Sequence, residues 1–363
     1  MNVQEARTKW LEDKPVHEAR GVYLPGVQMY LPDEWRRNDQ LALDAQPTLS
    51  TDPNSAIPSI MTTVIDPRVF RIVFTPLNFA KILGEQKNGD WVNDTWIFPV
   101  VEETGEVSSY SDFVNNGRAG VNLNFPNFQS YLFQTFIRYG ERELERAGLA
   151  KINYVSELGV AAADLLNRFQ NLSYAFGISG LQNYGIINNP FLSSYITPAT
   201  KAAGGTAWFN GNSPNATANE VYNDINALVQ KLISQTNGVI EMDDEMTLAL
   251  SPASAQALRF ANSFGVFVKE LLKEGYPNIR VVTAPQYGVN NANNPQGYST
   301  AGNAMQLIVK SIQGQQVAFA AFNEKLRAHK IIAEPSAWQQ KMTSGSWGTV
   351  LRMPLGVTGM IGI

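Results

Sequence analysis

One long helical pattern, preceded by β-rich sequence, limits the folds open to this chain more than any other feature. Its apolar residues recur at spacings of three and four: Val155, Leu158, Ala162, Leu165, Phe169, Leu172 and Phe176. This spacing is typical of one face of a helix. A helix from Leu149 to Phe176 would be about 40 Å long at a rise of 1.5 Å per residue. Because the chain has a single stripe of this kind, we expect one long helix lying across a sheet, in an α+β fold, rather than a coiled coil.

The sequence before the helix predicts a projecting β-hairpin. Asp94–Glu103 and Asn127–Tyr139 are both rich in strand-forming residues, and Pro99 inside the first indicates an edge strand. The segment between them is polar and contains glycines, as expected at the tip of a hairpin. Since an isolated hairpin is only marginally stable in water, we expect this one to lie on a neighbouring molecule.

The first sixty residues have the pattern of an extended arm. Prolines recur through them at 15, 25, 32, 47, 53 and 58, and polar residues separate single aromatic ones such as Tyr23 and Trp35. Frequent proline prevents long helices and removes hydrogen-bond donors from strands. The arm would bind through isolated aromatic anchors, although an unstructured tail fits the same pattern. A strand over Thr62–Phe74 and a short helix opened by Pro76 are expected next.

A second unit begins at a capping box, Thr217 to Glu220. One face of the helix behind it is apolar: Val221, Ile225, Leu228, Val229 and Leu232. Strands are predicted at Met246–Leu250, Asn278–Thr283, Ala304–Ile312, Gln316–Phe322 and Gly348–Val357, and helices from Ser251 and over Phe264–Glu274. This composition predicts an α/β unit in which helices cover a small sheet.

The charge balance argues against a protein that grips nucleic acid. The chain has 28 Lys and Arg against 32 Asp and Glu, so its net charge is 28 − 32 = −4, with no basic block. Charged residues make up 17%, below the usual quarter, as expected for a subunit whose surface is covered by its neighbours. We expect no signal peptide and no membrane span.

The sequence offers no convincing catalytic, cofactor or metal site. There is no cysteine, and the two histidines, His17 in the arm and His329 in a polar linker, accompany no nucleophile motif. The acidic run from Glu241 to Glu245 does not have the alternating oxygen ligands of a calcium loop. Glu102 and Glu103 are neighbours on a strand, so their side chains point to opposite faces. We therefore expect a protein that is not an enzyme and has no cofactor.

The order of these elements resembles that of the major capsid proteins of tailed phages with the Hong Kong 97-like fold. The resemblance lies in Asp94–Tyr139 as the extended loop, Tyr139–Gly185 as the spine helix, Thr217–Phe322 as the axial domain, and Trp347–Ile363 as the closing peripheral strand. It implies six parts: an arm (1–60), the first part of a peripheral domain (61–93), an extended-loop hairpin (94–139), the spine helix and peripheral domain (140–216), an axial domain (217–330) and a closing peripheral strand (331–363).

The resemblance also implies partners. Copies of the chain would form the pentamers and hexamers of an icosahedral phage head that encloses weakly contacted double-stranded DNA, in a virion assembled in the host cytoplasm. A scaffold protein and a portal protein would take part, and no membrane would. The residues expected to contact other subunits are Trp96, Phe98, Tyr110, Phe113 and Arg118 in the loop, with Tyr23 and Trp35 in the arm.

Two alternatives remain open at the level of sequence. An encapsulin-like nanocompartment shell protein would have the same fold and enclose protein cargo instead of DNA. A hydrolase with a carboxylate-based site would belong to another class and would be a soluble monomer or dimer with a pocket.

Overall fold

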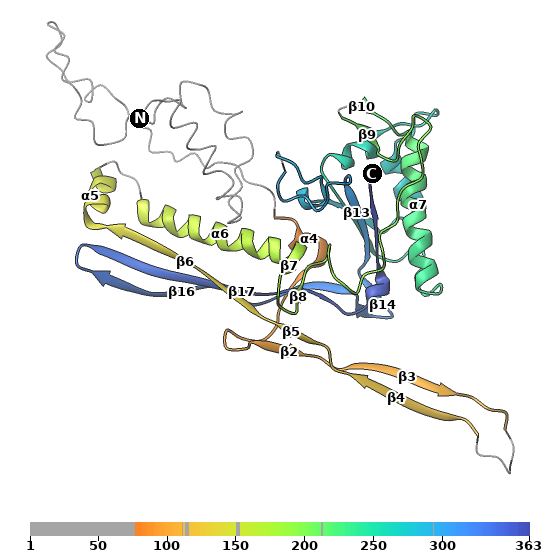
Figure 1. The fold of residues 1–363 in the computed structure, drawn as a ribbon, viewed down its shortest axis with the longest axis horizontal. Helices are drawn as coiled ribbons and strands as arrows, with labels where there is room; N and C mark the ends of the chain where they lie inside the picture. Colours follow the sequence, from red (N-terminus) through yellow and green to blue (C-terminus); the bar gives the residue numbers. More distant parts are fainter. Residues whose placement is uncertain (1–76, 111, 113–115, 150–152, 212, 293) are drawn as a thin grey trace, which may run out of the picture.

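The computed structural model describes residues 77–110, 112, 116–149, 153–211, 213–292 and 294–363. Within them a long sheet carries one long helix, a compact α/β unit lies at one end of this sheet, and a thin hairpin projects beyond it (Figure 1). The predicted arm, the predicted strand over Thr62–Phe74, and Tyr23, Trp35 and Phe113 lie outside the described residues.

The long sheet has four strands in the order β1-β16-β17-β6. These are β1 (Glu85–Lys87), β6 (Tyr131–Gly140), β16 (Ala318–Glu334) and β17 (Ala337–Leu351). Strand β6 pairs antiparallel with β17 along its whole length, from Gly140 opposite Ala337 to Tyr131 opposite Ser346. The alternation in β6 sets its faces, since Ile137 and Tyr139 are buried while Phe136 and Arg138 are exposed.

Helix α6 (Tyr154–Phe176) lies across this sheet, as the sequence predicts, and its buried face matches the predicted stripe only in part. Ala162 of the stripe is buried, and Val155 and Leu158 pack beside it. Leu166 is 3% exposed, whereas Leu165, which belongs to the predicted stripe, is 40% exposed. The last turns of α6 are packed on more than one side, so they bury polar residues as well. There Ser173 Oγ lies 2.7 Å from Ser346 Oγ, and Asn171 Oδ1 accepts a hydrogen bond from the Phe79 amide at 3.1 Å.

The helix is also shorter than predicted. A separate helix, α5 (Glu141–Leu149), precedes it, and α4 (Phe79–Leu83) lies before β1. The last turn of α6 meets a small ribbon formed by β7 (Gly177–Ile178) and β8 (Asn183–Tyr184). Gly177, with φ of 68°, and Gly185 allow this close approach, because a Cβ on Gly185 would lie 2.1 Å from the Ala175 carbonyl oxygen.

The projecting hairpin consists of two short ribbons rather than two continuous strands. Its outer ribbon pairs β3 (Val100–Glu106) with β4 (Arg118–Asn124), and its inner ribbon pairs β2 (Thr95–Ile97) with β5 (Asn127–Gln129). Pro99 and Pro126 separate the two ribbons, since neither residue has an amide hydrogen for the ladder. The predicted return strand was therefore wrong beyond Gln129, because Tyr131–Gly140 belongs to the long sheet.

The α/β unit has a second four-stranded sheet in the order β12-β11-β13-β18. Its elements are α7 (Ala218–Gln235), β11 (Met246–Leu250), α8 (Val268–Gly275), β12 (Ile279–Thr283), β13 (Ala304–Val309) and β18 (Val357–Ile361), with 3₁₀ turns at Ser254–Arg259, Pro285–Tyr287 and Pro354–Gly356. Two small ribbons join β9 (Phe209–Asn210) to β10 (Ser213–Pro214) and β14 (Ser311–Ile312) to β15 (Gln315–Gln316).

Several predictions for this unit are confirmed. Strand β11 has the predicted bounds, and the capping box forms because the Thr217 hydroxyl accepts from the Glu220 amide while the Glu220 carboxylate accepts from the Thr217 amide. The predicted face of α7 is buried in the core from Val221 to Leu232. Helix α8 begins four residues later than predicted, at Val268.

The predicted boundaries between the α/β unit and the rest of the chain were wrong. Strand β16 begins at Ala318 and belongs to the long sheet, so His329 lies in a strand and not in a linker. The closing segment divides in two, because β17 belongs to the long sheet and β18 belongs to the sheet of the α/β unit. The 3₁₀ turn at Pro354–Gly356 interrupts the single strand predicted over Gly348–Val357.

Candidate assembly surface

The outer ribbon of the hairpin has one apolar face. Val101 lies opposite Leu123, and Val121 lies opposite Glu103 on the same side. Their exposed fractions are 56% for Val101 and 60% each for Val121 and Leu123. We call Val101, Val121 and Leu123 the apolar face of the hairpin, and nothing in the described part of this copy buries it.

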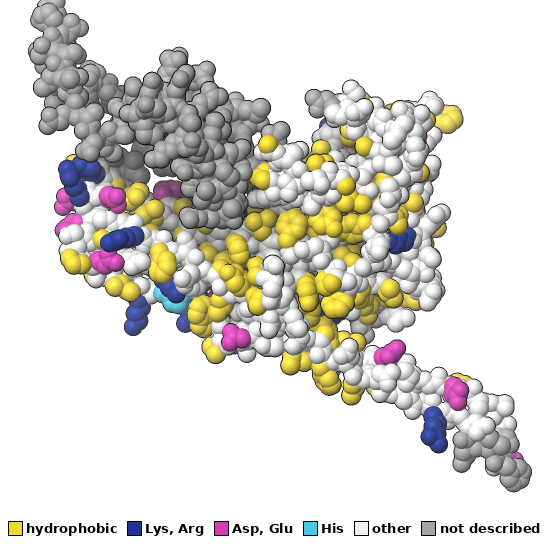
Figure 2. Space-filling model, viewed as in Figure 1, with side chains coloured by type: hydrophobic (Ala, Val, Ile, Leu, Met, Phe, Trp, Pro, Cys, Tyr) yellow, Lys and Arg dark blue, Asp and Glu magenta, His cyan; other side chains and the backbone are white. Residues whose placement is uncertain are grey.

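The opposite face of the ribbon is polar. It carries Glu102 opposite Asn122 and Glu106 opposite Arg118, and the Asn122 amide donates to the Glu102 carboxylate at 3.2 Å. From residue 94 to 124 the chain has five acidic residues and one arginine, a net charge of 1 − 5 = −4, which equals that of the whole chain. Figure 2 shows these acidic side chains along the hairpin, with one basic side chain near its tip.

Aromatic packing fixes the base of the hairpin to the long sheet. The ring of Trp96 lies 6.1 Å from that of Trp347 and 6.1 Å from that of Phe319, and Phe98 stacks on Phe128 at 5.7 Å. The Trp347 indole donates to the Asn88 carbonyl at 2.9 Å. Trp96 and Phe98, two of the predicted contact residues, thus anchor the hairpin within their own chain.

The other predicted contact residues lie farther out. Tyr110 is exposed near the tip and donates a 2.5 Å hydrogen bond to Asp112, which raises the pKa of the Tyr110 hydroxyl. Arg118 lies at the start of β4, opposite Glu106. The structure brings Trp96 and Phe98 together at the base, and it keeps both apart from Tyr110 at the far end of the hairpin (Figure 1).

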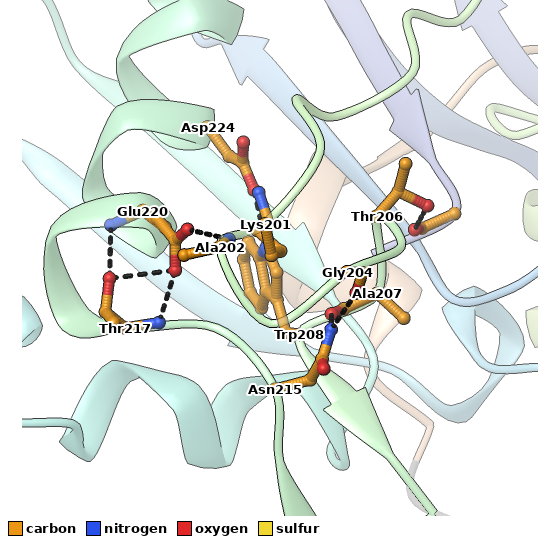
Figure 3. A network of polar contacts seen from close by, with 11 residues as sticks. Lys201, Ala202, Gly204, Thr206, Ala207, Trp208, Asn215, Thr217, Glu220 and Asp224 are labelled. Carbon is orange, nitrogen blue, oxygen red and sulfur yellow. Dashed lines mark hydrogen bonds and ion pairs between the residues drawn. The ribbon is translucent and has the colours of Figure 1, made fainter.

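A buried ionic cluster in the α/β unit escaped the sequence analysis. Lys201 and Asp224 are 1% and 3% exposed at their side chains, and Lys201 Nζ lies 2.5 Å from Asp224 Oδ2. The Trp208 indole donates to the same oxygen at 2.7 Å (Figure 3). No sequence signal distinguishes this lysine, which lies in a stretch that has the composition of a solvated loop.

Further tethers hold the same loop. The Ala202 amide donates to the Glu220 carboxylate at 2.7 Å, and the Asn215 amide group donates to the carbonyls of Gly204 and Ala207 at 2.8 and 3.0 Å (Figure 3). Hydrogen bonds from the backbone amides of Thr217 and Ala202 hold the pKa of Glu220 below its ordinary 4.5. These hydrogen bonds and the burial of Trp208 hold the stretch from Lys201 to Trp208 against the unit.

Neither a metal centre nor a membrane span is present in the described ranges. No three His, Asp or Glu side chains among the described residues lie close enough together to hold a metal ion. In the same part of the chain, no helix is both long and apolar enough to cross a bilayer. Glu102 and Glu103 lie on opposite faces of β3, as predicted.

Solved structures with a similar fold include capsids. The capsid of Myoviridae phage XM1 matches with a TM-score of 0.67 and 14% identity over 85% of this chain and 100% of that one. The capsid of the native GTA particle matches with a TM-score of 0.54 and 11% identity, over 85% of this chain and 99% of that one. A structure from Gordonia phage Cozz matches with a TM-score of 0.54 and 10% identity, over 84% of this chain and 91% of that one. These matches show the Hong Kong 97-like fold of tailed-phage capsids.

A comparison with curated protein sequences gave no match. A family model does match, and it covers residues 48–362, which include the long sheet, the hairpin and the α/β unit. Its members are structural proteins, so neither the hydrolase hypothesis nor a nanocompartment assignment is supported. The chain belongs to the Pa193 gp26 major capsid protein family and is a shell protein of phage heads, not an enzyme.

Proposed function

We propose that copies of this chain form the pentamers and hexamers of an icosahedral head, and that each copy lays the apolar face of its hairpin on the next copy. The exposed apolar face is the observation that carries the proposal. A two-stranded ribbon is marginally stable in water, and this one extends away from its own core. Covering Val101, Val121 and Leu123 would contribute roughly 1 kcal/mol or more each, because each is more than half exposed.

The head would enclose double-stranded DNA with little direct binding. The net charge of −4 and the lack of a basic block support a wall that tolerates DNA without gripping it. A portal protein and a scaffold protein would complete the head, and assembly would take place in the host cytoplasm. The intersubunit roles of Tyr110, Phe113 and Arg118 in the loop, and of Tyr23 and Trp35 in the arm, belong to the same proposal.

The experiment compares two sets of substitutions on opposite faces of the hairpin. The triple variant V101S/V121S/L123S removes the apolar face, and T104S/N122S alters the polar face as a control. Purified chains would be examined by sedimentation and negative-stain electron microscopy, with a crowding agent present. We expect shells or rings from the parent and the control, and folded but unassembled subunits from the triple variant. Normal shells built by the triple variant would refute the proposal.

A shorter chain provides a second measurement. Deleting Glu106–Gly120 removes the tip while leaving the base aromatics Trp96 and Phe98 in place. We expect this chain to fold, because the base packs on the long sheet, and to remain unassembled. Far-UV circular dichroism would establish folding independently of assembly.

A further inference from the structure

The outer half of β16 has one edge without a partner strand among the described residues. Strand β17 pairs with β16 as far as Glu334, whereas β1 pairs with the other edge only from Ala320 to Phe322. From Glu324 to Glu334 this second edge is therefore open, over about 36 Å at 3.3 Å per residue. An open strand edge of this length is a template on which a further strand can form.

Exposed apolar side chains lie along the same half of β16. Ile331 is 56% exposed and Ile332 is 62% exposed. Ile331 lies on the side of the sheet that carries α6, because its partner Gln340 shares a face with Met342, which packs under α6. Among the described residues, the apolar cluster beneath the first half of α6 contains residues of β6 and β17 but none of β16. The helix thus leaves this part of β16 uncovered.

The described chain enters the fold beside this open edge. Helix α4 packs against both α6 and β16, at the end of α6 nearer to the α/β unit (Figure 1). The Phe79 amide donates to Asn171 in α6 at 3.1 Å. The Ala320 amide in β16 donates to the Gly84 carbonyl, directly after α4, at 2.9 Å. The chain before Leu77 must therefore start from a point next to the open edge of β16.

The sequence just before this point alternates as a strand does. Residues 68–74 carry valine and arginine on one side and three large apolar residues on the other: Phe70, Ile72 and Phe74. Pro67 precedes the run and cannot donate a hydrogen bond to a ladder. Seven residues extend about 23 Å as a strand, so the open edge is long enough to hold them.

We propose that residues 68–74 add to the open edge of β16 as a fifth strand of the long sheet, with Phe70, Ile72 and Phe74 on the side that carries α6. The strand would run antiparallel to β16, because it leads to α4 at the start of β16. It would belong to the same copy, since only Thr75 and Pro76 separate it from the described chain. Such a strand would pair open backbone groups and cover the apolar side chains beside α6.

This strand would also direct the arm. The residues before it would leave β16 on the way to the far turn at 335–336 rather than beside the α/β unit, which sets where the arm can meet other copies. The contact itself lies within one copy, so it goes beyond the proposed assembly and can be tested on unassembled subunits.

Hydrogen exchange read by mass spectrometry, in peptides covering 324–334, tests the proposal. The variant F70S/I72S/F74S removes the apolar side of the segment, and V69S/V73S changes its opposite side as a matched control. We expect slow exchange over 324–334 in the parent and the control, and exchange about tenfold faster or more in the triple variant, at every protein concentration. Circular dichroism would monitor folding.

Three results would overturn the inference. The first is fast exchange over 324–334 in the parent, and the second is equal exchange in the two variants. The third is protection that appears only at high protein concentration, because another copy would then cover the edge.

A disulfide scan gives a second readout that does not depend on how the triple variant folds. The chain has no cysteine, so I331C can be combined in turn with F70C, I72C or F74C, and with V69C or V73C as controls. We expect a cross-link within one chain for at least one of the first three pairs and for neither control, because a disulfide needs Cα atoms within about 7 Å. Absence of a cross-link in all three pairs, or cross-links only between two chains, would also overturn the inference.

Discussion

The buried Lys201–Asp224 pair predicts a strongly non-additive pair of substitutions. Asp224→Ala leaves an ammonium group in a site where it is 1% exposed, and it removes the acceptor of the Trp208 indole. Breaking a buried pair from one side costs about 3–5 kcal/mol in free energy of unfolding. Lys201→Met strands the carboxylate instead and should cost a similar amount, with the Trp208 hydrogen bond offsetting part of it.

The double variant K201M/D224A removes both charges from the site. Only the Trp208 N–H is then left without a partner, at a cost of about 1–3 kcal/mol. The double variant should therefore be more stable than either single one, with a coupling energy of about 3 kcal/mol or more.

Urea unfolding of unassembled subunits, followed by tryptophan fluorescence, measures all four free energies of the cycle. The reasoning fails if Asp224→Ala costs less than about 1 kcal/mol, which would mean that water reaches the site. It also fails if the double variant costs the sum of the single ones, because the two groups would then act independently.

Two further predictions concern the capping box and the end of α6. Because the pKa of Glu220 is depressed, its contribution to stability is full above its ordinary pKa of 4.5 and is lost as the pH falls below that value. Glu220→Gln should therefore lower the urea midpoint at pH 7 and have the same midpoint as the parent at acidic pH. A difference between the midpoints of variant and parent that is the same at both pH values would contradict this. Gly185→Ala should lower the free energy of unfolding by about 3 kcal/mol, because the new Cβ meets the backbone of Ala175. Gly159→Ala, in the open middle of α6, should be neutral or slightly stabilising. Equal urea midpoints for the two alanine variants would refute the steric argument.

The elements predicted well are those in which one local pattern sets the structure. The capping box at Thr217 needs only residues three apart, and the apolar face of α7 follows from helical periodicity. Strand β11 is buried on both sides and short, so its apolar run marks both ends. Each of these elements can therefore be predicted without knowing which distant residues pack against it.

The errors arise where distant residues set the structure. Strand β16 continues through Lys325, Arg327 and Lys330, whose composition does not indicate a strand, because its second half is exposed and is held by pairing with β17. Leu166 replaces Leu165 in the core because the position of α6 on the sheet sets the buried face. The ionic cluster at Lys201 depends on a loop meeting α7, and no local spacing encodes that contact.

The candidate assembly surface was likewise predicted only in part. Two β-rich segments with a polar tip predicted the projecting hairpin, but they did not predict the roles of its aromatic residues. Trp96 and Phe98 anchor the base because Phe319 and Trp347, more than two hundred residues later in the chain, pack against them. Sequence alone cannot distinguish an aromatic that binds a neighbour from one that packs on its own chain.

The pairing of β16 with β17 has a mechanical consequence. The 17 residues of β16 span about 56 Å at 3.3 Å per residue, and both strands are continuous chain between the α/β unit and the far turn at 335–336. A pull between these two ends is carried by two covalent backbones in parallel, so it need not break side-chain contacts or separate the hydrogen-bonded ladder. The subunit should therefore be stiff under tension along the long sheet and should extend little between its two sheets.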